Sequence, residues 1–325
     1  MEVAAQPQVE EKGFSKDMMT LEECKRIFLA PTVDVCEKYT AMMTLRTFGT
    51  QEAADILEQG YQFLGESELL RHDVMYCMGQ MRAKNSLKFL LERMNDHQER
   101  SIVRHEAGEA LANFHDIKEQ IIEEMQKHWD TTDDLLRSTV HVGIGKLKNY
   151  TENSRYGKKY GGTIEPAEPF NEQETREYIK SLGLDDPKTN AELLNTIESI
   201  LLRPYSDINE FYKYRLCYYL RDQADQRSKE ILCKILSAPS RPVISALLRH
   251  ELCFIMGQIN NKDKIIQDTL KEVSIDQEEH PVVRHEAILS FYDVTQDEEF
   301  IKEFFTHENQ LIRESVEVAY KIGEE

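Results

Sequence analysis

A histidine followed directly by an acidic residue occurs four times in this chain, each time after an arginine and among apolar residues. The four pairs are His72-Asp73, His105-Glu106, His250-Glu251 and His285-Glu286. A carboxylate is almost never fully buried without a partner, because an unpaired charge in an apolar interior is very costly. The four acids therefore predict a shared partner, and a cation is the simplest candidate.

The types of these side chains limit which cation fits. Imidazole and carboxylate without thiolates suit iron, manganese or zinc, and a mixed set with open positions is typical of non-haem iron. One tetrahedral zinc needs only four ligands, so this many groups indicates two metals. Helical di-iron proteins usually carry Glu-x-x-His motifs, whereas this chain places histidine and acid side by side.

Two simpler explanations compete with a metal site. Residues that recur in a helical repeat usually maintain packing, and a lone buried histidine is more often a hydrogen-bonded core residue than a ligand. Yet four of the ten histidines occupy the same motif position. The acids have no evident ion-pair partners except the arginines that precede the histidines, which we interpret as structural: Arg71, Arg104, Arg249 and Arg284. We therefore favour the metal site.

Other residues near the motifs have weaker signals. Gly79 and Gly257 lie seven residues, about two turns, beyond His72 and His250, and hence on the same helical face. Close helix packing is the favoured reason for them, and room for a substrate chain is the alternative. No role is predicted for the glutamines that follow, Gln80 and Gln258. The remaining histidines are expected at the surface: His97, His115, His128, His141, His280 and His307.

Positioning four such pairs requires a helical scaffold. Apolar residues recur at three- and four-residue spacing, strand-like alternation is scarce, and the chain has only nine prolines and fourteen glycines. His72 to His105 is 33 residues and His250 to His285 is 35, which is the length of a helical-hairpin repeat. Such hairpins stack with equivalent helices side by side, so we predict an all-α fold of stacked hairpins.

Two longer spacings indicate an internal duplication. His72 to His250 is 178 residues, and His105 to His285 is 180. Matching segments flank the pairs, among them Lys38–Thr50 and Lys213–Asp225. We therefore predict two homologous helical halves. If these halves face each other, up to eight nitrogen and oxygen ligands converge between them.

The predicted organisation has four parts. They are a frayed tail at 1–19, an N-terminal half at 20–147, a linker at 148–189 and a C-terminal half at 190–325, whose repeats start at about 208 after a leading segment. Residues Lys148–Gln173 concentrate Gly, Pro and polar residues, which disfavours a long helix. Because this connection is unusually long, we expect it to cross the outside of the two halves.

Composition excludes several classes of partner. The chain has 40 basic and 59 acidic residues, a net charge of −19, which argues against nucleic acid or an anionic membrane surface and favours a basic protein partner. It has no apolar run of about 18 residues and no signal-peptide pattern, so we expect a cytoplasmic protein. The six cysteines form no CxxC motif and are expected to be buried, reduced thiols.

The segments "VRHEAGEALANF", "LRHELCFIMGQI", "VRHEA", "IRESVEVA" and "TIEPAEP" closely resemble deoxyhypusine hydroxylases. The similarity extends over nearly all of residues 20–325. It implies HEAT-like helical repeats in two halves around a di-iron centre. It further implies a monooxygenase that uses O2 to hydroxylate deoxyhypusine, a modified lysine on a basic loop of the hypusine-carrying translation factor.

The resemblance also implies a ligand set. It assigns one iron to His72, His105 and Glu106, and the other iron to a second group of three, His250, His285 and Glu286. Asp73 and Glu251 would be free to receive the substrate amine. The alternative is that these two acids are additional or water-mediated ligands.

This chain departs from the family pattern in two places. The family pattern has glutamate in all four pairs, whereas this chain has Asp73, whose carboxylate is one carbon–carbon bond, about 1.5 Å, shorter. The fourth motif continues as "AILSFYDV", where a small, alanine-rich helix is expected. Two other functional classes compete: a catalytically silent scaffold that binds a basic protein, and a di-metal hydrolase with the same ligands.

Overall fold

Helices form all the regular secondary structure in the part of the chain that this computed structural model describes, residues 19–152, 154, 163–204, 206–259 and 263–323. The all-α prediction is confirmed for those residues. The predicted tail lies outside them except for Met19, and so do residues 153 and 155–162 of the predicted linker. None of the described helices is long and apolar enough to cross a membrane.

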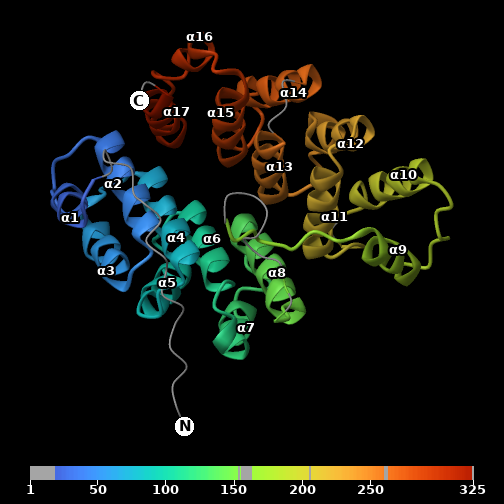
Figure 1. Cartoon of the computed structure of the whole chain (residues 1–325), viewed down its shortest axis with the longest axis horizontal. Helices are drawn as coiled ribbons and strands as arrows, with labels where there is room; N and C mark the ends of the chain where they lie inside the picture. The colour runs from blue at the N-terminus through green and yellow to red at the C-terminus, as the bar shows by residue number, and fades with distance from the viewer. Residues whose placement is uncertain (1–18, 153, 155–162, 205, 260–262, 324–325) are drawn as a thin grey trace.

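Figure 1 shows the order of these helices along the chain. The first part of the chain forms α1 (Leu21–Phe28), α2 (Val35–Phe48), α3 (Gln51–Gly60), α4 (Glu68–Met81), α5 (Ser86–Asn95), α6 (Ser101–Leu111), α7 (Lys118–Gln126) and α8 (Asp134–Asn149). The second part forms α9 (Glu172–Ser181), α10 (Asn190–Leu201), α11 (Glu210–Gln223), α12 (Gln226–Leu236), α13 (Ala246–Gln258), α14 (Lys264–Ile275), α15 (Pro281–Thr295), α16 (Glu298–Lys302) and α17 (Gln310–Gly323). Three short 3-10 turns are η1 (Tyr61–Phe63), η2 (His115–Ile117) and η3 (Ala238–Ser240).

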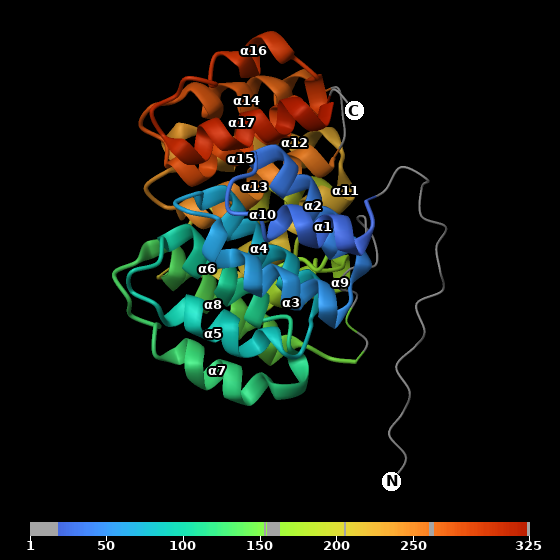
Figure 2. The ribbon, with the colours of Figure 1, turned by 90° about the vertical axis from the view of Figure 1, so that its left-hand side faces the viewer.

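The helices form an inner ring with a partial outer layer. Contacts between consecutive inner helices run through α2, α4, α6, α8, α11, α13, α15 and α17 and then return from α17 to α2 (Figure 1). The outer layer includes α1, α3 and α5 on one side and α10, α12 and α14 on the other. Figure 2, turned by 90°, shows α17 next to α2, so the last helix of the chain closes the ring against one of the first.

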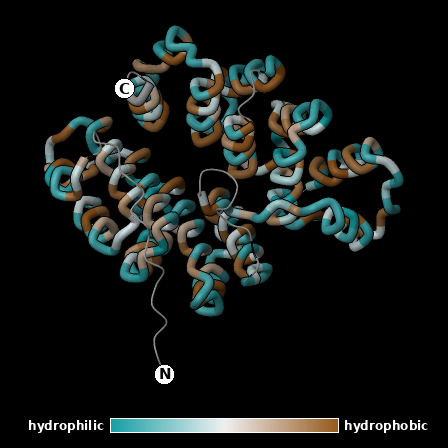
Figure 3. The backbone as a smooth tube through the Cα atoms, viewed as in Figure 1, coloured by the Kyte–Doolittle hydropathy of each residue, from teal (hydrophilic) through white to brown (hydrophobic). Residues whose placement is uncertain are grey.

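Burial of apolar faces holds this arrangement together. Polar and apolar residues are mixed along the helices (Figure 3), and the buried apolar residues of neighbouring helices form one continuous core. On α4, for example, Leu70, Val74 and Met75 are at most 3% exposed. All six cysteines are buried and free, as predicted.

Local caps define where the motif helices begin. The hydroxyl of Ser67 accepts a hydrogen bond from the Leu70 N–H (3.1 Å) at the start of α4, and Ser245 does the same for Leu248 (3.1 Å) at the start of α13. Each histidine pair of these two helices therefore lies in the second turn, at a fixed height above a capped end.

The connection between α8 and α9 differs from the expectation that it runs along the outside. Of its described residues, Glu165, Ala167 and Phe170 are buried, and residues 163–166 line a pocket inside the ring. Two hydrogen bonds join the side chain of Gln80 to the backbone of Ile164, at 2.7 and 3.2 Å. This part of the linker is therefore an internal wall of the molecule.

Candidate metal centre

Four inner helices, α4, α6, α13 and α15, bring the four motif histidines together. The ring centroids of His72 and His105 are 5.6 Å apart, and those of His250 and His285 are 5.4 Å apart. Across the ring, His72 lies 6.5 Å from His285, and His105 lies 6.3 Å from His250. Residues far apart in the sequence thus form one compact cluster of imidazoles.

Two of the acids complete two groups of three. Ligand atoms of His72, His105 and Glu106 lie within 4.8 Å of one another, and so do those of the second group, His250, His285 and Glu286. Glu106 Oε2 lies 3.3 Å from His72 Nε2 and 3.5 Å from His105 Nε2. These are the six residues that the family resemblance assigns to two metals.

Hydrogen bonds at Nδ1 fix the tautomers of two of the imidazole rings, His105 and His285. His105 Nδ1 is 3.0 Å from the hydroxyl of Thr139, and this hydroxyl already donates its hydrogen to the Leu135 carbonyl (2.9 Å). The hydroxyl must therefore accept, which places the imidazole proton on Nδ1. Ser315 has the same relation to His285 Nδ1 (3.3 Å), because it donates to the carbonyl of Leu311.

The Nε2 atoms of the four motif histidines, which face the centre, show whether a metal fits. Among the described residues, the Nε2 atoms of all four histidines are buried and have no hydrogen-bond partner. A buried polar atom without a partner is costly, and a metal ion would use these lone pairs. Donation from Nδ1 to a neighbour is also the usual arrangement around metal-bound histidine. The residues therefore fit a pair of metal ions.

Burial sets the charge of most of these rings. It lowers the pKa of His250 to about 3 and that of His105 and His285 well below the usual value, with help from neighbouring imidazoles. Neutral imidazole is the form that binds metals. His72 differs, because its hydrogen bond with Asp73 and the negative charges of Glu106 and Asp73 outweigh burial and raise its pKa to about 10.

Burial outweighs the nearby cations for two of the carboxylates. Burial, together with the negative charge of Glu251, raises the pKa of Glu286 to about 8. Burial also raises the pKa of Glu251 to about 7, although a hydrogen bond from Tyr218 opposes this. A bound divalent cation would reverse both shifts, because it stabilises the ionised form.

The two remaining motif acids also line the centre, but their contacts differ. Asp73 Oδ1 lies 2.6 Å from Nδ1 of His72, its own neighbour in the chain. Glu251 instead accepts a hydrogen bond from the hydroxyl of Tyr218 on α11. Both acids are at least nine-tenths buried.

A pocket of about 790 Å³ contains the centre. Its lining combines acids with apolar and aromatic side chains, including Glu109, Glu165, Asp293, Tyr39, Tyr76, Phe254, Leu289 and Tyr292. An aliphatic chain that ends in an amine matches such a lining, because the stem packs on apolar groups and the charge meets carboxylates.

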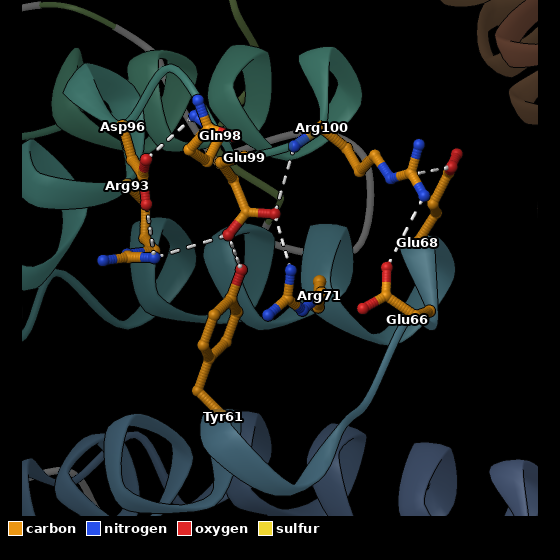
Figure 4. A network of polar contacts seen from close by, with 9 residues as sticks. All are labelled: Tyr61, Glu66, Glu68, Arg71, Arg93, Asp96, Gln98, Glu99 and Arg100. Carbon is orange, nitrogen blue, oxygen red and sulfur yellow. Dashed lines mark hydrogen bonds and ion pairs between the residues drawn. The ribbon is translucent and has the colours of Figure 1, made fainter.

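The arginines of the motifs are structural, as predicted. Arg71 donates to Glu99 (2.8 Å), a buried acid that also accepts from the Tyr61 hydroxyl (2.6 Å) and the backbone N–H of Arg100 (3.1 Å), as Figure 4 shows. In the second part of the chain, Arg249 pairs with Glu279 in the same way. These contacts attach each first-motif helix to the turn before the next one.

The other two arginines bind across the hairpin turns. Arg104 donates to the Met94 carbonyl (3.1 Å) and Asp133 (2.9 Å), and Arg284 donates to the Ser274 carbonyl (3.1 Å).

The structure also accounts for the glycines and glutamines beyond the motifs. A Cβ on Gly79 would lie 2.7 Å from the backbone of Ala110, and one on Gly257 would lie 2.9 Å from Ser290 Oγ. Close packing is therefore confirmed as a reason for both glycines, and Gly257 also lines the pocket. Gln80 holds the linker, and Gln258 accepts from Arg221 (2.7 Å).

Two of the six histidines expected at the surface are buried, so that prediction was wrong for them. His115 stacks on Tyr150 with 3.6 Å between ring centroids, and it is 9% exposed. His128 contacts Asn95 Oδ1 through Nε2 (2.7 Å) and is 8% exposed. Their polar neighbours in sequence concealed these contacts, which come from distant parts of the chain.

Sequence reasoning missed a polar group beside the centre. Lys146 is fully buried and donates to Asn113 Oδ1 (2.5 Å) and the Glu165 carbonyl (2.7 Å). Arg221 pairs with the Glu165 carboxylate. Burial raises the pKa of Glu109, which lies one turn after Glu106. Only Glu109 had a sequence signal, since an acid three residues after Glu106 shares its helical face.

Comparison with known proteins gives a consistent result. No protein-family model matches the chain. A deoxyhypusine hydroxylase of Neosartorya fischeri is 30% identical over 278 residues, which cover 81% of this chain and 75% of the relative. The enzyme of Aspergillus clavatus is 27% identical over 321 residues (92% and 88%), and that of Mus musculus is 26% identical over 318 residues (94% and 93%).

A solved structure has the same fold. Human deoxyhypusine hydroxylase in complex with glycerol matches with a TM-score of 0.75, covers 94% of this chain and 96% of its own, and is 23% identical. With its helical fold and with relatives at this identity and coverage, the chain belongs to the deoxyhypusine hydroxylase family, whose members hydroxylate deoxyhypusine.

Proposed function

We propose that this chain hydroxylates deoxyhypusine on the hypusine-carrying translation factor, with two iron ions and O2. The observation that carries the proposal is the pair of facing His-His-Glu groups, whose four Nε2 atoms are buried without partners. An imidazole and carboxylate set that leaves coordination positions open suits non-haem iron.

Each group of three would hold one ion. His72, His105 and Glu106 would bind the first, and the second group, His250, His285 and Glu286, would bind the other. Iron supplies the redox chemistry with O2 that side chains cannot. Thr139 and Ser315 hold His105 and His285 in the tautomer that presents Nε2 to the pocket.

The pocket would position the substrate side chain. Its apolar residues, such as Phe254 and Leu289, would pack against the methylene chain and exclude water from it. Asp73 or Glu251 would receive the amine, which places the carbon to be hydroxylated near the metals. The charge of −19 would attract a cationic side chain on a basic loop.

Two structural predictions accompany this function. We propose that residues 20–147 and 190–325 are homologous HEAT-like halves joined by a linker at 148–189. This proposal is supported by the packing of α4 on α6 and of α13 on α15, since each of these two pairs of helices contributes motif residues to the pocket. The described residues of this linker then include the helix α9. We also expect the protein to work in the cytoplasm.

Single substitutions test the ligand assignment. His105→Ala and His285→Ala should each lower bound iron from about two ions per chain toward one, and lower hydroxylation about 100-fold or more. His141→Ala on α8 is the control, because His141 contacts the Trp129 carbonyl (3.2 Å) and does not line the pocket. Iron is measured by elemental analysis, and hydroxylated product by mass spectrometry.

The outcomes also separate the competing functions. Full iron content in both variants would contradict the ligand set. A wild-type protein that binds no metal and modifies no substrate would indicate a scaffold. Product that forms equally well without O2 would indicate a hydrolase.

A further inference from the structure

The segment Ile164–Phe170, which we call the strap, takes the place of two helices in the wall of the pocket. Six of the eight inner helices contribute residues to the lining, whereas none of the described residues of α8 or α11 does. The first three residues of the strap line the pocket instead. Pro166 also borders a small cavity lined by Lys146 of α8 and Tyr214 of α11. The strap therefore lies between the pocket and the junction at which α8 packs on α11.

Side chains from the first part of the chain hold the beginning of the strap. Gln80 of α4 donates to the Ile164 carbonyl (3.2 Å) and accepts from the Ile164 N–H (2.7 Å). Lys146 of α8, which is fully buried, donates to the Glu165 carbonyl (2.7 Å). Two successive residues of the strap are thus bound through their backbone groups, so these contacts fix the path of the chain itself.

Side chains of α11, in the second part of the chain, hold the rest of the strap. Arg215 donates to the Glu168 carbonyl (2.9 Å), and its guanidinium lies 3.9 Å from the centroid of the Phe170 ring. The N–H of Phe170 donates to the Arg215 carbonyl (3.4 Å). Arg221 pairs with the Glu165 carboxylate. The strap is therefore held from both parts of the chain and at both of its ends.

The glutamines near the ends of α4 and α13 both act on this segment. Gln80 and Gln258 are 178 residues apart, which is also the spacing between His72 and His250. Gln80 binds the strap directly, whereas Gln258 accepts from Arg221 (2.7 Å), which binds the strap. Equivalent positions of the two predicted halves therefore hold one segment that belongs to neither half.

The energetics favour a role for the strap beyond joining two helices. Lys146 and Arg221 are at most 1% exposed, and a buried ion pair seldom returns as net stability what the burial of its charges costs. A connection across the surface would keep its backbone hydrated without that cost. Pro166 and Pro169 further restrict the backbone of the strap. The contacts therefore give the strap one fixed position.

We propose that the strap is a fixed wall of the substrate pocket, and that Gln80 and Arg215 are positioning residues that hold its two ends. The strap keeps the pocket narrow on the side of α8 and α11, so a slender alkylamine chain packs against the facing helices and does not enter the junction behind. No residue of the strap is a candidate metal ligand, so its effect is on the side chain that enters the pocket. This inference rests on the proposed function and adds residues that shape its substrate pocket.

Variants that release one end of the strap test the proposal. Gln80→Met and Arg215→Met remove the hydrogen bonds to Ile164 and Glu168 and keep an unbranched side chain. Amide hydrogen exchange of residues 164–170 should become about tenfold faster in each variant. KM for a deoxyhypusine peptide should rise about threefold or more, with kcat within about twofold, because looser holding of the side chain weakens binding uniformly. Bound iron should stay unchanged.

Two further variants serve as controls. Gln51→Met removes a glutamine of the outer layer that donates to Asp55 (2.8 Å), accepts from the Asn85 N–H (3.4 Å) and does not line the pocket. It should change neither strap exchange nor KM. Arg215→Lys keeps a donor for the Glu168 carbonyl, so its KM should lie between those of the wild type and Arg215→Met.

Faster strap exchange with an unchanged KM would overturn the proposal, because the strap would then only fill space. Unchanged strap exchange would overturn the assignment of Gln80 and Arg215. Absence of hydroxylation by the wild-type protein would refute the proposed function instead. The wall is then tested with zinc alone: a chelator should remove bound zinc about threefold or more faster from Gln80→Met than from the wild type, and equal rates would overturn the proposal.

Discussion

The direction in which each imidazole presents its nitrogens decides what the centre can bind. His105 and His285 donate from Nδ1 to hydroxyls on the next inner helix, and their Nε2 atoms meet no protein partner. In a neutral ring this leaves the Nε2 lone pair free for a metal. The proposed ligand set thus depends on Thr139 and Ser315, two small side chains that have no charge of their own.

His115 provides a prediction about pH at the same scale. Burial lowers its pKa to about 3, so the folded protein keeps this ring neutral while the unfolded chain takes up a proton below about pH 6.5. The contribution of the neutral His115 ring to the free energy of unfolding is therefore fully present above pH 6.5 and is lost as the pH falls toward 3. His115→Phe keeps a ring stacked on Tyr150 and should reduce the pH slope of the unfolding free energy between pH 6 and 4 by about one proton, or about 1.4 kcal/mol per pH unit.

The measurement is denaturant unfolding at several pH values. His97→Phe serves as a control, because His97 is not among the buried side chains. An unchanged slope in His115→Phe would show that the ring is protonated in the folded state.

Among the helices, α4 and α6 approach each other closely where Gly79 faces the backbone of Ala110. This approach sets the separation of the His72 and His105 rings, because both histidines lie on the same pair of helices. On α13, Gly257 faces the side chain of Ser290, which can rotate away.

We expect different costs from the same substitution at these two glycines. Gly79→Ala should lower the free energy of unfolding by about 1–3 kcal/mol, since backbone must move to admit the methyl group. Gly257→Ala should be nearly neutral, because the gain in helix propensity of about 1 kcal/mol offsets a side-chain rearrangement. Denaturant unfolding measures both, and equal effects would contradict this account.

The elements themselves were largely predictable from the sequence. The three- and four-residue periodicity gave the helices, and the four repeated pairs gave six residues that the structure brings together in two groups. The contact between Tyr218 and Glu251 was not predictable, because it joins residues 33 positions apart whose pairing depends on how α11 packs on α13. The linker was misjudged for a similar reason, since the carboxylate of Glu165 pairs with Arg221, which lies 56 positions away in the sequence.

For the whole molecule, the return of α17 to α2 and α4 closes the ring. The Ser67 hydroxyl donates to Glu314 of α17 (2.7 Å), which joins residues 247 positions apart. The matching cap, Ser245, donates to Glu210 on the neighbouring α11 instead. The two caps are therefore alike locally and differ in whether they hold the ring closed.

This difference predicts where each cap variant loosens the molecule. Ser67→Ala and Ser245→Ala should each cost about 1 kcal/mol for the lost cap. Only Ser67→Ala should also speed amide hydrogen exchange in α17 and α2, because it releases Glu314. Hydrogen exchange followed by mass spectrometry resolves the helices. Equal exchange of α17 in the two variants would show that the Ser67–Glu314 contact does not stabilise the closure.

The closure also links the site to the order in which the chain is synthesised. Ser315, which fixes the tautomer of His285, lies on α17, the helix that completes the ring. Earlier helices can fold while synthesis continues. The second candidate metal group, however, cannot reach its final arrangement until α17 has been synthesised and has packed beside α15, so a chain without α17 would present an unfinished centre.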